Sequence, residues 1–492
     1  MSKYFKTSAR PVSTKILVLV VCLAQFMVIL DVSIVNVALP SIGHGLHFST
    51  TGLSWVINAY TITFAGLLLL GGRATDLLGR KSIFIVGTAM FSVFSLMAAV
   101  SDSQMTLLIA RGLQGVAAAL MSPASLSIIT THTAEGPERT RALGVWASVA
   151  GLGASSGALL GGLLTQGIGW PAIFAVNVPV GLAVVLAARR AIPDHEPRDI
   201  ESERHFDALG ATLVTAGLAT FAFAIVRTAT LGWISTGVLV PLAAAVVMLA
   251  GFIYVERSVS HWPLMPLSIF KVQRVRWANT IIVLAYAGLF SMFYFITLFL
   301  QQIQGHDAII AGVSFLPTTL GVFFSSNRAS RVIARFGLRT TAVAGLLLSA
   351  AGLVYLSTVG PGSDYFTGVL PGLVLSGLGM GTTLVSGTVA ATQGVPSNEA
   401  GLASGLLNTS RMVGGALGLA VLSTIAASVT RGDVALGHAV ATTDGYNLAL
   451  LLGAALSLIG AGVAAAKFGG RTVVPVVTLA TRPVREAERV AA

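Results

Sequence analysis

Charged residues and cysteines are the two things that this sequence has in short supply. Asp, Glu, Lys and Arg together make up 10% of the 492 residues, whereas a soluble domain carries about 25%. The single cysteine, Cys22, lies inside a long apolar run, which excludes an internal disulfide and a cysteine-ligated metal. Hydrophobic residues make up 54% of the chain. These proportions predict a polytopic membrane protein.

The sequence also lacks short motifs that carry ATPase or enzyme chemistry. It contains no G-x-x-x-x-G-K-[ST] phosphate-binding loop and no H-E-x-x-H zinc motif. We therefore expect no enzymatic activity, no bound metal and no cofactor. The expected energy source is an ion gradient.

What is present instead is a series of fourteen apolar runs, each long enough to cross a hydrocarbon core of about 30 Å as a helix. We expect an all-α membrane protein with an N-terminal six-helix half (1–190), a linker with two extra helices (191–256), a C-terminal six-helix half (257–468) and a cytoplasmic tail (469–492). The runs lie near residues 16–38, 52–71, 82–101, 104–125, 142–165, 171–188, 208–227, 234–255, 278–300, 309–326, 341–359, 366–388, 401–428 and 446–467.

The net charge of +11 is distributed in a way that indicates membrane topology, not nucleic-acid binding. If the N-terminus is cytoplasmic, all of the 30 Lys and Arg residues except Arg111, Arg227, Arg411 and Arg431 fall on the cytoplasmic side. The positive-inside rule then places both termini in the cytoplasm. The first apolar run is too long for a signal peptide and lacks a small-x-small cleavage site, so we expect an uncleaved first helix.

The connection between the second and third runs is short, glycine-flanked and basic. It reads Gly71-Gly72-Arg73-Ala74-Thr75-Asp76-Leu77-Leu78-Gly79-Arg80-Lys81. We expect a tight turn at a membrane face, with the basic side chains near lipid headgroups. A degenerate copy at 334–339 aligns Gly337 with Gly79, and such internal repetition is how many transporters build a central site between two halves.

The G-x-x-x-D-x-x-G-R-K pattern of this connection resembles the signature loop of the major facilitator superfamily of transporters. Leu77 stands where an arginine commonly follows the aspartate. The resemblance implies a cytoplasmic gating loop that latches the two halves together. The matching residues are Gly72, Asp76, Gly79, Arg80 and Lys81.

Five further segments resemble the fourteen-helix drug:proton antiporter branch of that superfamily. They are 30–40 at the end of the first helix, 111–115 in the fourth, 151–162 in the fifth, where Ala158 holds a position that is usually proline, 177–181, and 408–415. In the fifth helix the resemblance assigns Gly153, Gly157, Gly161 and Gly162 to a seal that suppresses proton leak. Plain small-xxx-small packing explains the same spacing.

Asp31 and Arg111 are charges within apolar runs, and such residues are rare and commonly functional. At 1.5 Å per residue, Asp31 lies about 22 Å from the inner face and Arg111 about 9 Å from the outer face. Both therefore fall at a similar depth and can pair. Our hypothesis is that Asp31 carries the transported proton and that Arg111 tunes its proton affinity. The alternative is a permanent ion pair that only joins helices one and four.

The substrate cavity is poorly determined by the sequence. On the first helix, Gln25 and Asn36 share a stripe about 120° away from Asp31, so we expect the two amides to line a cavity. Arg411 is a further cation within a span. The remaining candidates are polar or aromatic residues within spans, because apolar cavities with few fixed charges suit amphipathic ligands: Asn58, Tyr60, Gln114, Tyr286, Tyr294 and Gln301.

The leading functional prediction is a monomeric, proton-coupled antiporter in a bacterial cytoplasmic membrane that exports small amphipathic drugs, antibiotics or toxic metabolites. Its expected partners are the substrate, protons and the lipid bilayer. A proton-coupled nutrient symporter shares the same fold, and a lipid or lipid-precursor exporter would use the same cavity. A membrane sensor or scaffold without transport gives no reason for a buried Asp31.

Overall fold

The computed structural model describes residues 14–133, 137–193, 207–259, 267–393, 400–432 and 437–469. Within these ranges the chain is helical and contains no strand. Thirteen helical segments are long and apolar enough to span a membrane, and α5 (Pro137–Gly167) adds a further long helix of 31 residues. The expectation of an all-α membrane protein is confirmed, and thirteen of the fourteen expected spans are among these segments.

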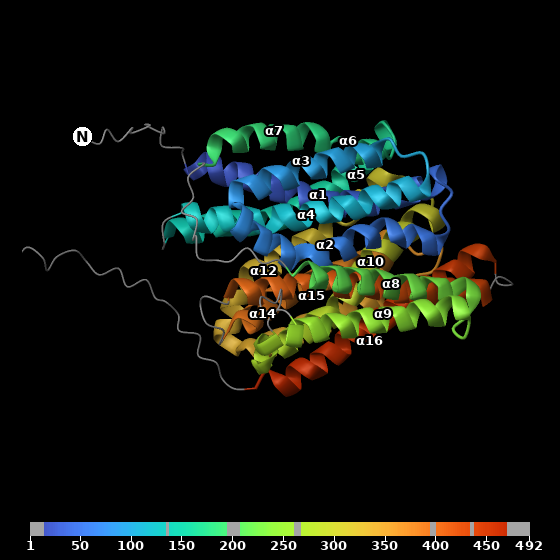
Figure 1. The fold of residues 1–492 in the computed structure, drawn as a ribbon. Coiled ribbons are helices and arrows are strands. Elements are labelled where there is room, and N and C mark those ends of the chain that lie inside the picture. The colour runs from blue at the N-terminus through green and yellow to red at the C-terminus, as the bar shows by residue number, and fades with distance from the viewer. Residues whose placement is uncertain are drawn as a thin grey trace, which may run out of the picture.

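The helices form a bundle of roughly parallel and antiparallel segments (Figure 1). The N-terminal half contains α1 (Thr14–Gly45), α2 (Thr50–Leu78), α3 (Arg80–Ala99), α4 (Gln104–His132), α5, α6 (Ala172–Ala175) and α7 (Asn177–Ala191). A hairpin of α8 (Ala208–Leu231) and α9 (Thr236–Tyr254) follows. The C-terminal half contains η2 (Leu267–Lys271), α10 (Gln273–Leu298), η3 (Phe299–Ile303), α11 (Ala308–Ser314), α12 (Leu316–Phe336), α13 (Leu338–Leu356), η4 (Tyr365–Val369), α14 (Leu370–Thr392), α15 (Ala400–Gly432) and α16 (His438–Lys467).

Several helices begin where a short polar side chain satisfies a free backbone amide. Ser49 Oγ accepts a hydrogen bond from the amide of Gly52 at the start of α2, and Ser103 Oγ accepts one from Thr106 at the start of α4. Asp307 does the same before α11. Such caps stabilise a helix start by about 1 kcal/mol, so the polar residues between apolar runs set where the spans begin.

The turn between α2 and α3 differs from the expectation in its length. We expected a turn over the whole segment 71–81, but α2 continues to Leu78 and the turn is Gly79 alone, with φ +95°. In the C-terminal half, Gly337 with φ +85° separates α12 from α13 in the same way. Only glycine enters this backbone region without strain. The structure therefore reproduces the predicted repeat in its glycine turns, Gly79 in one half and Gly337 in the other.

The two halves share one apolar cluster at one end of the bundle and have separate clusters at the other. We call the end where α1 begins and α16 ends the terminal end, and the opposite end the distal end. The distal cluster joins side chains of α1, α2 and α4 to those of α10, α11 and α15. Toward the terminal end, one cluster belongs to the N-terminal half, apart from contacts with Met412, Val413 and Phe290, and another to the C-terminal half.

Polar contacts also join the halves near the distal end. Gln301 Nε2 donates to the carbonyl of Val37 at 2.7 Å, and Gln166 Nε2 donates to Asp307 Oδ2 at 3.2 Å. These bonds and the shared cluster hold α1 and α5 against the start of the C-terminal half. The distal end is therefore the closed end of the interface between the halves.

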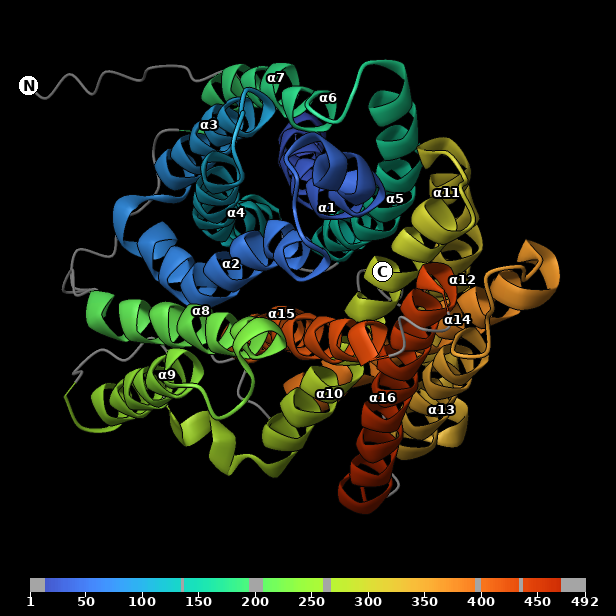
Figure 2. The ribbon, with the colours of Figure 1, turned by 90° about the vertical axis from the view of Figure 1, so that its right-hand side faces the viewer.

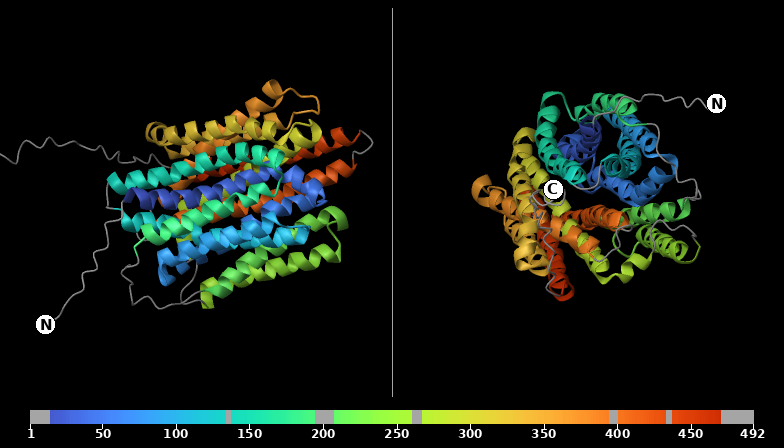
Figure 3. Two further views of the ribbon diagram at one scale, coloured as in Figure 1. Left: turned by 90° about the horizontal axis from the view of Figure 1, so that it is seen from above. Right: turned by 90° about the vertical axis from the view of Figure 1, so that its left-hand side faces the viewer.

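The α8–α9 hairpin lies beside the interface between the halves (Figures 2 and 3). A small apolar cluster joins Ile62 of α2, Ala222 of α8 and Ala420 of α15. Thr424 Oγ1 of α15 donates to the carbonyl of Ile225 of α8 at 3.3 Å. Helix α8 thus contacts one helix of each half.

Candidate functional site

A buried ion pair between Asp31 and Arg111 lies at the centre of the N-terminal half. Arg111 Nη1 of α4 lies 2.5 Å from Asp31 Oδ2 of α1, and the two side chains are 1% and 0% exposed. The similar depth estimated from the sequence is thus matched by a direct contact. Breaking a buried pair by removing one partner typically costs about 3–5 kcal/mol, so each charge stabilises the burial of the other.

Neutral side chains complete the environment of the aspartate. Its second oxygen, Oδ1, accepts hydrogen bonds from Gln114 Nε2 at 3.3 Å and Asn177 Nδ2 at 3.2 Å. Gln114 Nε2 also donates to Ser95 Oγ at 2.7 Å. The sequence placed Gln114 among the cavity residues, whereas its amide belongs to this network. Ser95 was missed, and the only signal for Asn177 was its place in a segment, 177–181, that resembles the antiporter branch.

Arg111 has acceptors besides the aspartate. Its Nε donates to the carbonyl of Val56 on α2 at 3.0 Å, and Nη1 also donates to Gln114 Oε1 at 2.9 Å. The guanidinium carbon lies 4.5 Å from the ring centroid of Tyr60 and 5.7 Å from that of Phe174. The arginine is therefore held by a carbonyl, an amide and two aromatic faces, and the network joins α1, α2, α3, α4, α6 and α7.

The glycines of α5 pack against the stretch of α1 that carries Asp31. A Cβ at position 153 would meet Ile29 at 3.0 Å, one at 157 would meet Ser33 Cβ at 2.5 Å, and one at 161 would meet the carbonyl of Ile34 at 2.9 Å. This is the close approach that small-xxx-small spacing allows.

Gly162 has a different neighbour from the other three glycines. A Cβ there would lie 2.6 Å from the carbonyl oxygen of Ala308 on α11, so this glycine belongs to the contact between the two halves.

The basic residues of the predicted gating loop contact other helices of the N-terminal half. Arg80 Nε donates to Ser127 Oγ on α4 at 2.8 Å, and Lys81 Nζ donates to the carbonyl of Arg189 at the end of α7 at 3.0 Å. A Cβ at Gly72 would lie 3.8 Å from Pro123. The side chain of Asp76 lies outside the described residues.

Several predicted cavity residues have other contacts in the structure. Gln25 was expected to line a cavity, but it is 8% exposed and its Oε1 accepts a hydrogen bond from Ser122 Oγ of α4 at 3.1 Å. Asn36 donates to the carbonyl of Val32 within its own helix. Both Gln25 and Asp31 contact α4, so the 120° separation on the wheel did not place them against different neighbours.

Further candidates lie in the interface between the halves or next to it. Gln301 bonds to α1 as described, and Tyr294 is fully buried in the distal cluster. Asn58 is also fully buried, and both of its amide atoms lack a partner among the described residues. Gln301 and Tyr294 thus lie in the contact between the halves, and their assignment to a substrate cavity stays a prediction.

A second arginine–tyrosine pair lies in the C-terminal half. The guanidinium carbon of Arg411 on α15 lies 4.9 Å from the ring centroid of Tyr286 on α10. Arg411 Nη1 donates to Asn408 Oδ1 at 3.3 Å. The Nε of Arg411 and the hydroxyl of Tyr286 are buried and have no hydrogen-bond partner among the described residues. Both residues were predicted from the sequence as cavity residues, but nothing in the sequence indicated that they meet.

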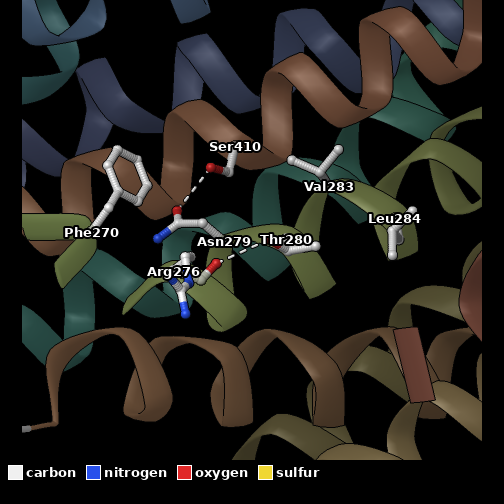
Figure 4. Close-up of a pocket in the computed structure, with 7 residues that line it drawn as sticks. All are labelled: Phe270, Arg276, Asn279, Thr280, Val283, Leu284 and Ser410. Carbon is white, nitrogen blue, oxygen red and sulfur yellow. Dashed lines mark hydrogen bonds between the residues drawn. The ribbon is translucent and has the colours of Figure 1, made fainter. Parts of the chain in front are cut away.

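An open pocket of about 340 Å³ lies between α10, η2 and α15 (Figure 4). On its wall, Ser410 Oγ donates to Asn279 Oδ1 at 2.8 Å. Ser410 is the neighbour of Arg411, and Asn279 lies two turns before Tyr286 on the same side of α10. Its lining residues are Phe270, Arg276, Asn279, Thr280, Val283, Leu284 and Ser410.

Comparison with known proteins identifies the class to which these features belong. Residues 21–419 match the Major Facilitator Superfamily. The chain is 39% identical over 435 residues to the cephamycin export protein CmcT of Amycolatopsis lactamdurans, covering 88% of this chain and 89% of that protein. It is 38% identical to the puromycin resistance protein pur8 of Streptomyces alboniger, covering 92% and 91%. The chain belongs to the major facilitator superfamily, a family of membrane transporters for small molecules.

Solved structures share the fold at much lower identity. The POT family transporter PepTSo superposes with a TM-score of 0.66 at 16% identity, covering 92% of this chain and 99% of that one. The nucleoside transporter NupG gives a TM-score of 0.65 at 14% identity, covering 93% and 100%. At these identities the likeness supports the fold.

Proposed function

We propose that this protein exports small amphipathic molecules of the antibiotic type across the bacterial cytoplasmic membrane in exchange for protons. The named activities of its relatives support the export part of this proposal, because the two described above are an export protein and a resistance protein. A third relative, 34% identical, is a tetracenomycin C resistance and export protein of Streptomyces glaucescens. Such an exporter would confer resistance on the cell that contains it.

The observation that carries the proton-coupling part is the buried Asp31–Arg111 pair and its surroundings. Two of the acceptors of Arg111 do not depend on the charge of the carboxylate. Here Arg111 retains the carbonyl of Val56 and the oxygen of Gln114 when the carboxylate is neutralised. Asp31 can therefore accept a proton without leaving the arginine free of partners, which would otherwise cost several kcal/mol. These contacts support the proposal that Asp31 is the proton carrier and that Arg111 tunes it.

The proposed transport cycle follows from the contacts between the halves. With both termini in the cytoplasm, the distal end faces outward, and its shared cluster closes the outer side. The separate clusters of the terminal end would then belong to a state that is open inward. Export requires the distal contacts to separate while the inner ends meet, as two halves rock about a site near the middle of the membrane. We propose that a monomer suffices for this cycle, because each half contributes its own network.

The test is flux in proteoliposomes that contain the purified full-length protein. A pH gradient is imposed, and radiolabelled cephamycin or puromycin and lumenal pH are followed together for the parent and for Asp31→Asn. We expect drug movement coupled to proton movement in the opposite direction in the parent. Asp31→Asn, which keeps the shape of the side chain, is expected to abolish the coupling while leaving the Tm within a few degrees of the parent.

Other outcomes point to other functions. Drug and proton movement in the same direction would favour the symporter. Proton-coupled transport that survives in Asp31→Asn would remove the assigned role of this residue. If neither antibiotic moves, labelled phospholipid should be tested in the same vesicles, because a lipid exporter shares the fold and the cavity.

A further inference from the structure

We propose that Arg411 and Tyr286 form the binding site for a negatively charged group of the substrate, and that the substrate class is amphipathic organic acids. The inference rests on the proposed export function and adds the chemical class of the molecule. Arg111 in the N-terminal half has a carboxylate partner, whereas Arg411 in the C-terminal half has none among the described residues.

Arg411 is a cation within a membrane span without a counter-ion in the described part of the chain. It is partly buried, and among the described residues its polar and aromatic partners are the amide oxygen of Asn408 and the ring of Tyr286. The buried Nε lacks an acceptor. A charged side chain within the membrane costs at least about 2.5–3.5 kcal/mol, and these two contacts are weak compensation for it.

Arg111 shows what a compensated arginine looks like in the same protein. Both guanidinium groups lie over a tyrosine ring, at 4.5 Å for Arg111 and 4.9 Å for Arg411. Arg111 has a carboxylate at 2.5 Å in addition. The site at Arg411 therefore has the cation and the ring but lacks the acid, and a ligand carboxylate would supply it.

In the described part of the C-terminal half, no acid lies near enough to take this place. Among its described helices, the one acidic residue is Asp444, on α16 near the distal end. The next residue, Gly445, packs against Ala426 of α15, which lies about 22 Å along the helix from Arg411 at 1.5 Å per residue. A cationic substrate would thus find no carboxylate here, whereas an organic acid finds an unpaired arginine.

The surroundings of the pair suit an anion attached to an apolar body. The hydroxyl of Tyr286 is buried without a partner and can donate a hydrogen bond to a carboxylate oxygen. The ring of Phe290 lies 5.9 Å from that of Tyr286 and touches the apolar clusters of both halves. The hydrogen-bonding and apolar parts of the site therefore lie one turn apart on α10, and the charged part faces Tyr286 from α15.

The experiment compares a matched pair of fluorescent probes, dansyl-phenylalanine with its free carboxylate and the methyl ester of the same molecule. Binding to the purified full-length protein is measured in liposomes of phosphatidylcholine. The variants are Arg411→Gln, Arg411→Lys and Tyr286→Phe. Arg328→Gln is the matched control, because Arg328 is an exposed arginine over a phenylalanine ring in the same half.

We expect the parent to bind the acid at least tenfold more tightly than the ester. Arg411→Gln is expected to lower acid affinity at least tenfold and to leave ester affinity within twofold, because only the ion pair is lost. Arg411→Lys keeps part of the preference, since it keeps the charge. Tyr286→Phe lowers acid affinity by a few-fold, and Arg328→Gln changes neither affinity. Retained ester binding shows that each variant is folded.

Three results would overturn the assignment. The first is a parent that binds acid and ester equally, and the second is an acid preference that is unchanged in Arg411→Gln. The third is acid binding that falls when phosphatidylglycerol is added to the liposomes, in the parent and in Arg411→Lys alike, while ester binding is unchanged, because the occupant would then be a lipid headgroup. If acid binding depends on Arg411 but no proton-coupled flux occurs, the proposed antiport fails and the anion site stands.

Discussion

The contact between α1 and α5 gives a sharp prediction, because it is closest where the proposed proton carrier lies. In Gly157→Ala, the new Cβ would lie 2.5 Å from Ser33 Cβ and 3.0 Å from the backbone nitrogen of Ile34, whereas ordinary contact begins at 3.4 Å. The two helices must therefore separate by about 1 Å, and overpacking of this kind costs about 1–3 kcal/mol. We expect Gly157→Ala to lower both the Tm and the rate of coupled transport.

The matched control is Gly462→Ala on α16. A Cβ there meets nothing within 4 Å, and alanine is favoured over glycine in a helix by about 1 kcal/mol. We expect the Tm of this variant to equal or exceed that of the parent, with transport unchanged. Both variants add one methyl group to a helix interior, so their difference reports packing alone.

A compensating change provides the second arm of this test. Ser33→Gly removes the Cβ and Oγ atoms that a side chain at 157 would meet at 2.5 and 2.8 Å. Combined with Gly157→Ala, it should recover part of the lost stability, a non-additive effect expected of residues in contact. The measurements are intrinsic tryptophan fluorescence on heating and flux in proteoliposomes. The reasoning is refuted if Gly157→Ala is as stable as Gly462→Ala and insensitive to Ser33→Gly.

Three further predictions follow from single positions. Arg111→Lys should give folded protein with little coupled transport, because one ammonium group cannot reach both Asp31 and the carbonyl of Val56 as the guanidinium does. Flux and Tm measured together check this prediction, and full proton coupling in the variant would contradict it. Gly79→Ala should lower stability by about 1 kcal/mol or more because of the φ of +95°, and an unchanged Tm would show that the turn relaxes freely. Cys22, 4% exposed, should react with N-ethylmaleimide only after denaturation, and rapid labelling of the native protein would show that α1 is accessible there.

Much of this architecture can be predicted from the sequence, because the bilayer sets the length and composition of each membrane-spanning segment. Each span must be apolar over about 20 residues, and each turn needs residues that permit it. The number of spans, the glycine turns at Gly79 and Gly337, and the similar depth of Asp31 and Arg111 all follow from position along the chain. The family was also recognisable, because its motifs are local.

The assignment of neighbours is where sequence reasoning stopped or went wrong. A helical wheel gives the direction of a side chain but not the helix that lies there, so Gln25 was expected in a cavity and instead bonds to Ser122 of α4. Ser95 gave no signal at all, because a serine in a span resembles any other. The sequence also did not show that α2 continues to Leu78, through the segment predicted as a loop. This part of α2 packs closely against α4, where a Cβ at Gly71 would overlap the backbone of Ala119.

By itself, therefore, the sequence determined the number of spans, the end of the bundle where the positive charges gather, and the charges that enter the membrane. Only the tertiary structure decided which groups meet. Arg111 bonds to Asp31, which is 80 positions away in the sequence, whereas Arg411 contacts the ring of Tyr286 and no carboxylate among the described residues. The physical reason is that burial of a charge is governed by length and hydropathy along the chain, but its compensation depends on contacts between helices that are distant in sequence.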